Sequence, residues 1–166
     1  MNSLRSALFA ALAFGPAAAF AAPLTDVEIL NKIHAINEAE ISAGNLASTK
    51  SENKDVKKFA KDMVGKHSEV DNKLADLAKT KTIALTDQTP PPDPLAAQTG
   101  VDFDRGYARK MVSGHDDALK FLATADAATQ DKDIKKFIEK IQPEVAHHKK
   151  MAEKLEKKLG PSKATP

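Results

Sequence analysis

A proline-rich stretch near the middle of the chain limits the folds open to this sequence. Residues 82–100 read TIALTDQTPPPDPLAAQTG, with four prolines among residues 90–94. Proline fixes φ, lacks an amide donor and breaks helices, so the stretch predicts a long irregular connection. Connections of this length are uncommon inside compact domains. This one can return the chain along a whole helix, because about twenty extended residues reach roughly 60 Å and a helix of about 27 residues is roughly 40 Å long.

The segments on either side carry apolar residues at helical spacing and show no alternating strand pattern. Four helices are therefore predicted, one beginning near Asp26 and three spanning about 53–81, 99–127 and 131–160. Local start and stop signals support these bounds. They are the capping box Thr25-x-x-Glu28, the similar start Thr99-x-x-Asp102 and the stop Gly160-Pro161.

The connections between these helices predict the topology. Short turns make neighbouring helices antiparallel, whereas a connection that returns along the bundle makes the second and third helices parallel. The sequence thus predicts an all-α, ferritin-like four-helix bundle with a long Pro-rich crossover between helices 2 and 3. Two internal echoes are consistent with related hairpins: FAKDMVGKH (59–67) resembles YARKMVSGH (107–115), and KDVKKFA (54–60) resembles KDIKKFI (132–138).

The first residues have the pattern of a secretory signal peptide. MNSLRSALFAALAFGPAAAFAAP has one positive charge at Arg5, then an apolar run that ends in the small-x-small motif Ala19-Phe20-Ala21. This pattern predicts cleavage after Ala21. The chain is therefore expected to comprise a cleaved signal peptide at 1–21, a helical bundle at 22–160 and a flexible tail at 161–166. No later stretch approaches the roughly 20 apolar residues of a transmembrane span, so none is expected in the mature protein.

The composition excludes several kinds of chemistry. The chain has no cysteine, which excludes disulfides, thiolate ligands and a lipid anchor through cysteine. Removal of Arg5 leaves 24 basic and 23 acidic residues, a net charge of +1. This balance gives no electrostatic footprint for nucleic acid, so no nucleic-acid partner is expected. The sequence also lacks a Gly-rich phosphate loop and a serine-nucleophile motif, and we favour a non-enzymatic role.

Polar residues interrupt the apolar stripe of every predicted helix. Asn37 and Glu40 fall on the first stripe, and His67, His115 and His148 fall on the other three. Their spacing of three or four from apolar residues turns them toward the core, where polar groups need partners. Three imidazoles and a carboxylate suit a divalent transition metal such as zinc, iron, copper or manganese. We therefore predict a metal site at Glu40, His67, His115 and His148, with Asn37 as a weak ligand or an orienting group.

A metal-free interpretation remains open at this point. Core histidines, a glutamate and an asparagine can form a hydrogen-bonded network that fixes helix register without an ion. Counted from the first hairpin turn, Glu40 and His67 differ in height by roughly 9 Å at about 1.5 Å per residue. Asn37 lies closer in height to His67, and His34 closer still. The polar groups can therefore form one site or two separate layers.

Other candidate ligands are weaker. Glu144-x-x-His147 is the one Glu-x-x-His pair, but a di-iron site needs two such pairs and two further glutamates. His34 lies one step off its stripe and is expected at the boundary of the core. Met63 and Met111 could bind copper through sulfur, although methionines on helical stripes are usually core residues.

Four segments resemble one family of exported bacterial proteins. They are NEAEISAGNLA (37–47), VKKFAKDMVGKH (56–67), FDRGYARKMVSGH (103–115) and HKKMAEKL (148–155). These segments look like the domain of unknown function 4142 family, whose members have an expected ferritin-like fold and are sometimes labelled outer-membrane proteins. The resemblance covers nearly the whole mature chain. In that family an acidic residue often precedes the second-helix histidine; here Lys66 stands there, which removes one candidate ligand.

The resemblance implies the fold and export but no established activity. Our leading hypothesis is a periplasmic helical bundle, in solution or peripheral to the outer membrane, that binds a metal ion through its core residues. The alternative is a metal-free structural or envelope-stress protein that acts by binding a protein partner or a second copy of itself. A ferritin-like redox enzyme is a third hypothesis, which the incomplete di-iron motif disfavours.

Overall fold

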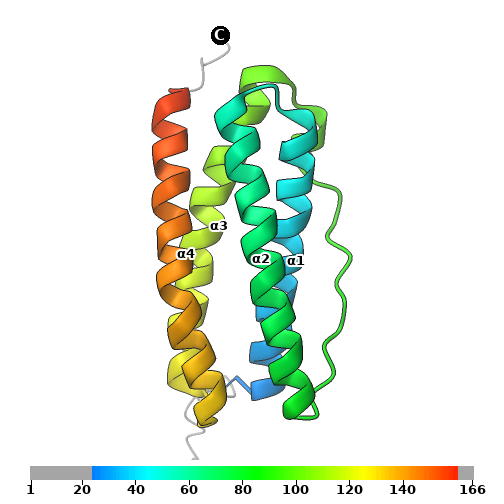
Figure 1. Cartoon of the computed structure of the whole chain (residues 1–166), viewed down its shortest axis with the longest axis vertical. Helices are drawn as coiled ribbons and strands as arrows, with labels where there is room; N and C mark the ends of the chain where they lie inside the picture. The colour runs from blue at the N-terminus through cyan, green and yellow to red at the C-terminus, as the bar shows by residue number, and fades with distance from the viewer. Residues whose placement is uncertain (1–23, 161–166) are drawn as a thin grey trace, which may run out of the picture.

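Four long α-helices and one short 3-10 helix build the fold (Figure 1). The structure is a computed structural model and describes residues 24–160. The signal peptide predicted at 1–21 and the tail predicted at 161–166 lie outside the described residues. The elements are α1 (Asp26–Lys50), α2 (Lys54–Thr80), η1 (Pro94–Ala97), α3 (Gly100–Ala128) and α4 (Lys132–Leu159).

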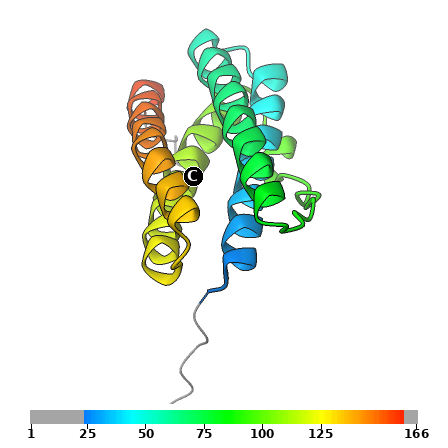
Figure 2. The same ribbon diagram turned by 60° about the horizontal axis from the view of Figure 1, so that its bottom comes forward.

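The four helices form a bundle with one long crossover, as the sequence predicted. In Figure 1, α1 and α4 run upward while α2 and α3 run downward, and the crossover passes alongside α1 from the lower end of α2 to the upper start of α3. Figure 2 shows the two hairpins, α1–α2 and α3–α4, as the two halves of the bundle. Across the halves, α2 lies next to α4 and α1 next to α3. Every neighbouring pair is therefore antiparallel, and the parallel pair α2 and α3 lies on a diagonal.

Side-chain caps fix the starts of three helices. Thr25 and Glu28 form the predicted capping box at α1: the Glu28 amide donates to Thr25 Oγ1 at 3.3 Å, and the Thr25 amide donates to Glu28 Oε2 at 2.8 Å. Asn53 at α2 and Asp131 at α4 each accept from two amides of the first turn. These contacts satisfy amides that have no partner within the helix.

Two glycines mark the start of α3 and the end of α4. Thr99 occupies the N-cap position of α3, but within the described chain its side chain makes no capping hydrogen bond. The expected start is therefore present without the expected cap. The chain instead enters α3 through Gly100, whose φ of 56° is a conformation that favours glycine. Gly160, with φ of 72°, follows α4 at the predicted stop.

Hydrogen bonds fix the crossover to α1. Asn31 accepts from the amide of Thr86 at 2.8 Å and donates to the carbonyl oxygen of Ala84 at 3.2 Å. Glu38 accepts from the amide of Gln88 at 2.6 Å. Because the crossover lacks regular secondary structure here, these side chains pair backbone groups that have no ladder of their own. The crossover is thus attached to the bundle along its path.

The core consists of two apolar clusters with a polar layer between them. One cluster lies at the end with the α1–α2 turn and includes Phe59 and Tyr107. The other lies at the end with the α3–α4 turn and includes Leu30 and Ile138. Each helix contributes residues to both clusters, and the polar residues of its stripe lie between those two contributions. They are Asn37 and Glu40 on α1, His67 on α2, His115 on α3 and His148 on α4.

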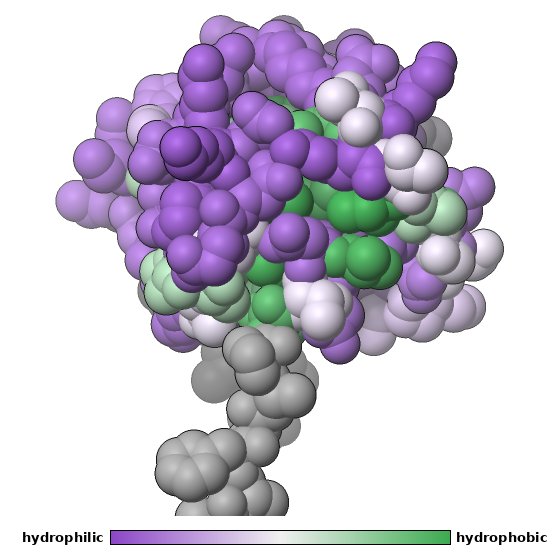
Figure 3. All heavy atoms as spheres, turned by 90° about the horizontal axis from the view of Figure 1, so that it is seen from below, coloured by the Kyte–Doolittle hydropathy of each residue, from purple (hydrophilic) through white to green (hydrophobic). Residues whose placement is uncertain are grey.

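The outer surface is largely hydrophilic. In the end-on view of Figure 3, hydrophilic side chains cover most of the surface and hydrophobic atoms show in strips between them. None of the described helices carries an apolar stretch of the length and hydropathy that a membrane crossing needs. The apolar faces of the helices are instead buried against one another.

Candidate metal centre

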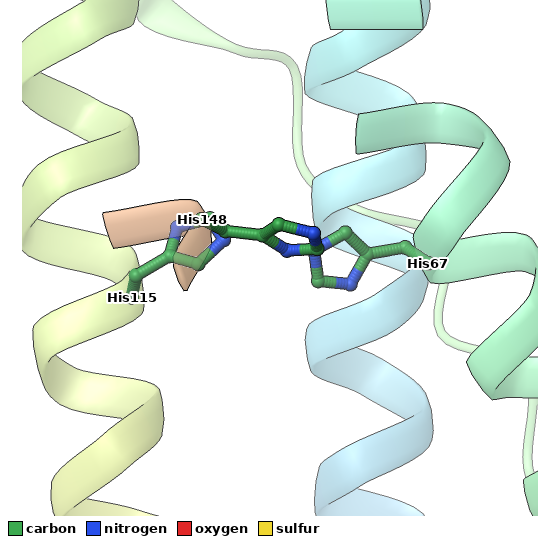
Figure 4. A group of neighbouring side chains, drawn as sticks. All are labelled: His67, His115 and His148. Atoms are coloured by element: carbon green, nitrogen blue, oxygen red, sulfur yellow. The ribbon is translucent and has the colours of Figure 1, made fainter. Parts of the chain in front are cut away.

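One histidine from each of α2, α3 and α4 meets in the middle of the bundle. His67, His115 and His148 point toward one another (Figure 4). Their ring centroids are 5.7 Å apart for His67–His115, 5.4 Å for His67–His148 and 5.6 Å for His115–His148. One ring nitrogen of each lies within 4.8 Å of those of the other two. The rings therefore form a nearly equilateral triangle, the arrangement that surrounds a single ion.

The three imidazoles are buried, and within the described part of the chain each has a ring nitrogen without a hydrogen-bond partner. Their exposed fractions are 5% for His67, 1% for His115 and 4% for His148. Nε2 of His67, Nε2 of His115 and Nδ1 of His148 are enclosed and have no hydrogen-bond partner among residues 24–160. A buried polar atom without a partner costs about 1–3 kcal/mol. Three such atoms in one layer destabilise a core unless a shared ligand pairs with them.

Hydrogen bonds to the other ring nitrogens determine where the protons lie. Nδ1 of His115 is 2.7 Å from the carbonyl oxygen of Met111, and because a carbonyl only accepts, this Nδ1 carries the proton. Nδ1 of His67 is 3.0 Å from Oδ1 of Asn37, which also only accepts. A neutral imidazole has its lone pair on the opposite nitrogen. Nε2 of both His67 and His115 is therefore free to bind a metal.

The surroundings keep the rings neutral. Burial, reinforced by the neighbouring imidazoles of His115 and His148, lowers the pKa of His67 to about 3. Burial lowers the pKa of His115 to about 4 although its hydrogen bond to Met111 acts in the opposite direction. Burial also lowers the pKa of His148. Metals bind the neutral imidazole, so at neutral pH each ring offers a lone pair without first having to release a proton.

A cavity of about 30 Å³ adjoins the triangle, and its lining includes the three histidines, Asn37 and Glu40. A single water molecule needs only about 10–15 Å³ of such a cavity, so there is room for an ion or a water molecule. Glu40 is 8% exposed, and its Oε2 has no hydrogen-bond partner in the described part of the chain. Burial raises the pKa of Glu40 to about 7, although the positive charge of Lys110 acts to lower it.

The structure divides the set of residues that the sequence proposed as ligands. It brings His67, His115 and His148 together and bonds Asn37 to His67. Glu40 faces the same cavity, but it is not a member of the group whose ligand atoms lie within 4.8 Å of one another. The difference in height between Glu40 and His67 along their helices accounts for this separation.

The pair Glu144 and His147 is not brought into the triangle. Glu144 lines the cavity, and its Oε1 lies 3.7 Å from Nζ of Lys66. His147 is exposed, and its ring centroid lies 6.4 Å from that of His148. Lys66 thus forms an ion pair with Glu144 that joins α2 to α4 beside the cavity.

His34 belongs to a separate group near the crossover, and at 7% exposure it is more buried than expected. Its Nδ1 lies 2.8 Å from Asp71 Oδ1, and its Nε2 lies 3.3 Å from Asp87 Oδ1 and 3.8 Å from Glu38 Oε2. Burial opposes a charge on His34, but hydrogen bonds to Asp71 and Asp87 raise its pKa overall. Although His34, Glu38 and Asp87 have ligand spacing, the hydrogen bonds from both ring nitrogens of His34 to Asp71 and Asp87 explain this group without a metal.

Sequence reasoning did not anticipate Asp71 or Asp87. Asp87 lies in the crossover, and no periodicity sets the path of that segment. The sequence does contain a signal for Asp71. It follows His67 by four residues, and residues at that spacing are neighbours on a helix surface. An acidic residue one turn after a core histidine is a candidate orienting group for it.

The fold and the site define a four-helix bundle with one crossover, whose apolar core contains a buried three-histidine layer. The chain matches the family described as Domain of unknown function (DUF4142) over residues 11–155. It therefore belongs to that family, as the resemblance in sequence predicted. No curated protein is significantly similar to it in sequence.

Three solved structures share the fold. The conserved hypothetical protein rv2844 from Mycobacterium tuberculosis is 15% identical with a TM-score of 0.69, and the match covers 83% of this chain and 94% of that one. A DUF305 protein from Streptomyces coelicolor, described as secreted, is 8% identical with a TM-score of 0.69 and coverages of 83% and 95%. CopM in the Cu(I)-bound form is 18% identical with a TM-score of 0.70 and coverages of 83% and 99%. At these identities the likeness establishes the fold alone.

Proposed function

We propose that this protein is an exported metal-binding bundle that holds one transition-metal ion, preferably Cu(I), between His67, His115 and His148. The observation that carries the proposal is the triangle of buried imidazoles, each with a nitrogen that lacks a partner among the described residues. Imidazole is a ligand for copper, zinc, iron and nickel. We assign a binding role because three ligands suffice to hold an ion, and holding it requires no chemical reaction of the protein.

The triangle needs only a small contraction to hold an ion. Bonds between metals and imidazole nitrogens are about 2.0–2.1 Å, so three nitrogens in a plane around one ion lie roughly 3.5 Å apart. The ring nitrogens here lie within 4.8 Å of one another. If side-chain rotations move each ring nitrogen by about 1 Å toward the centre, the nitrogens reach the separation that one ion requires. The helices need not move.

The charge of the site favours a monovalent ion. The three ligands are neutral, and the clusters above and below them are apolar. The cost of burying an ion increases with the square of its charge, so a divalent ion needs a compensating anion in a low-dielectric site. Glu40, which faces the cavity, could supply that anion by losing its proton. Cu(I) binding needs no such step, and Zn(II) with ionised Glu40 is the competing form.

Two fold neighbours support this proposal. CopM is a protein of this fold in a Cu(I)-bound form, and the DUF305 protein is described as secreted. The signal-peptide pattern of residues 1–21 supports export of this chain as well. Family membership and this pattern together support the periplasm as the location.

Anaerobic titration against a chromogenic Cu(I) chelator tests the proposal on protein purified after export. We expect one Cu(I) per chain, with X-ray absorption showing nitrogen ligands at about 2.0 Å. His67→Leu and His115→Leu should each abolish binding. His147→Leu is the matched control, because His147 is exposed and adjacent to His148 on α4, and it should bind as the wild type does. Absence of Cu(I) and Zn(II) binding, or equal loss in His147→Leu, would show that the proposal is wrong.

A further inference from the structure

Asn37 connects the three-histidine centre to an acidic residue outside it. Oδ1 of Asn37 lies 3.0 Å from Nδ1 of His67, and Nδ2 of Asn37 lies 3.2 Å from Oδ1 of Asp71. Asn37 is on α1 and is 3% exposed, whereas His67 and Asp71 are one turn apart on α2. The three side chains form a hydrogen-bonded relay that ends at the centre.

The carboxylate of Asp71 determines how the Asn37 amide is oriented. A carboxylate oxygen accepts hydrogen bonds and does not donate them, so the group of Asn37 that faces Asp71 is the amide Nδ2. Oδ1 of Asn37 must then face His67. Because Oδ1 only accepts, Nδ1 of His67 carries the proton and Nε2 carries the lone pair.

The opposite orientation would remove a ligand from the centre. If the amide turned over, Nδ2 of Asn37 would donate to Nδ1 of His67, and the proton of the neutral ring would move to Nε2. A protonated Nε2 has no lone pair for a metal. His34 donates from Nδ1 to the same Asp71 oxygen at 2.8 Å, so the side facing the crossover also holds the carboxylate in place.

We propose that Asp71, acting through Asn37, is a positioning residue of the three-histidine centre that fixes the Nδ1–H tautomer of His67. Neither residue needs to touch the ion. The expected effect on metal affinity rests on the proposed function. The tautomer itself is a property of the metal-free protein and is measured separately. Groups that orient metal-binding histidines typically contribute 10–100-fold to affinity.

Nitrogen-15 NMR of the histidine side chains in the metal-free mature protein provides the first test. Wild-type His67 should show the Nδ1–H tautomer, and Asp71→Ala should shift it toward Nε2–H. Asp76→Ala is the matched control, because Asp76 is exposed on the same helix, and it should leave the His67 signals unchanged. An Nε2–H tautomer in the wild type, or an unchanged tautomer in folded Asp71→Ala, would overturn the proposal.

Exchanging the two side chains tests whether the effect is specific. In the double variant Asn37→Asp/Asp71→Asn, the carboxylate at position 37 accepts from Nδ1–H of His67, and the amide at position 71 donates to that carboxylate. The Nδ1–H tautomer should therefore be restored although both partners have changed. A packing role alone gives no reason for such a rescue, and a folded double variant with the Nε2–H tautomer would contradict the relay.

Cu(I) affinity provides the functional test. We expect a 10–100-fold loss in Asp71→Ala and values close to wild type in Asp76→Ala and in the exchange variant. Wild-type affinity in Asp71→Ala would overturn the positioning role and leave the proposed function intact. A wild type that shows the Nδ1–H tautomer but binds neither Cu(I) nor Zn(II) would overturn the proposed function and support the orientation of His67.

Discussion

Gly114 leaves room for the carboxyl group of Glu40: a Cβ on Gly114 would lie 3.0 Å from Oε1 of Glu40. This space lets a long acidic side chain from α1 reach α3 next to His115. Two turns earlier on α3, burial and the charge of Glu40 raise the pKa of Tyr107. The Tyr107 hydroxyl is also buried without a hydrogen-bond partner in the stretch 24–160. Glu40 thus occupies a position that solvates a negative charge poorly.

Replacing Glu40 by glutamine is expected to stabilise the metal-free protein relative to wild type as the pH rises. The folded-state pKa of Glu40 is about 7, raised by burial from 4.5. The stability that this shift contributes is complete below pH 4.5 and is lost as the pH rises through about 7. Glutamine stays neutral at every pH. The free energy of unfolding of Glu40→Gln should therefore increase relative to that of wild type as the pH rises from 4.5 to about 7, by at most about 3 kcal/mol. Urea denaturation across this range measures the gain, and a constant difference would contradict it.

Acid is expected to destabilise the metal-free protein through its core histidines. The folded-state pKa values of about 3 for His67 and about 4 for His115 are below the ordinary 6.5. Between these values the unfolded chain binds protons that the folded chain does not, so the free energy of unfolding falls as the pH decreases from 6.5 toward 4. The raised pKa of Glu40 has the opposite effect on the free energy of unfolding as the pH falls, but this single carboxyl group acts against three histidines. Thermal melting from pH 4 to 7 should show a steeper decline in wild type than in His115→Leu; equal slopes would contradict this assignment.

The helices and the polar layer could be predicted because both follow from local patterns. The capping box at Thr25 and the stop at Gly160 are signals within one turn of the chain. A histidine on an apolar stripe, such as His115, faces the core of a bundle whatever its neighbours are. The parallel arrangement of α2 and α3 was predicted because the proline-rich stretch is long enough to return along a whole helix.

The membership of the site was harder to predict because it depends on relative heights of separate helices. His67, His115 and His148 meet because the crossover and the α3–α4 turn join α2, α3 and α4 at matching heights, which no single stripe reveals. Glu40 lies about one turn from Asn37 on α1, and that shift separates it from the triangle. Asp87 depends on the path of an irregular segment, for which periodicity gives no information.

Alanine substitutions at two glycines should have opposite effects on stability. A Cβ on Gly44 of α1 would lie 2.7 Å from Cγ2 of Val64 and 3.0 Å from the backbone oxygen of Ala60 on α2. The backbone cannot yield without separating the two helices, so Gly44→Ala should destabilise the protein by about 1–3 kcal/mol. A Cβ on Gly65 would meet no described atom within 4 Å, so Gly65→Ala should stabilise α2 by about 1 kcal/mol. Denaturant midpoints compare the two, and a destabilised Gly65→Ala would contradict the expectation.

Asn31→Ala is expected to loosen the crossover while leaving the bundle folded. The substitution removes the hydrogen bonds to the Thr86 amide and the Ala84 carbonyl. Water can replace both in this exposed segment, so the global free energy of unfolding should fall by only about 1 kcal/mol. The Thr86 amide loses its acceptor, so its hydrogen exchange should accelerate well before that of the helices. Asn45→Ala, at an exposed position on the same helix, is the control, and equal Thr86 exchange in both variants would show that Asn31 does not hold the crossover.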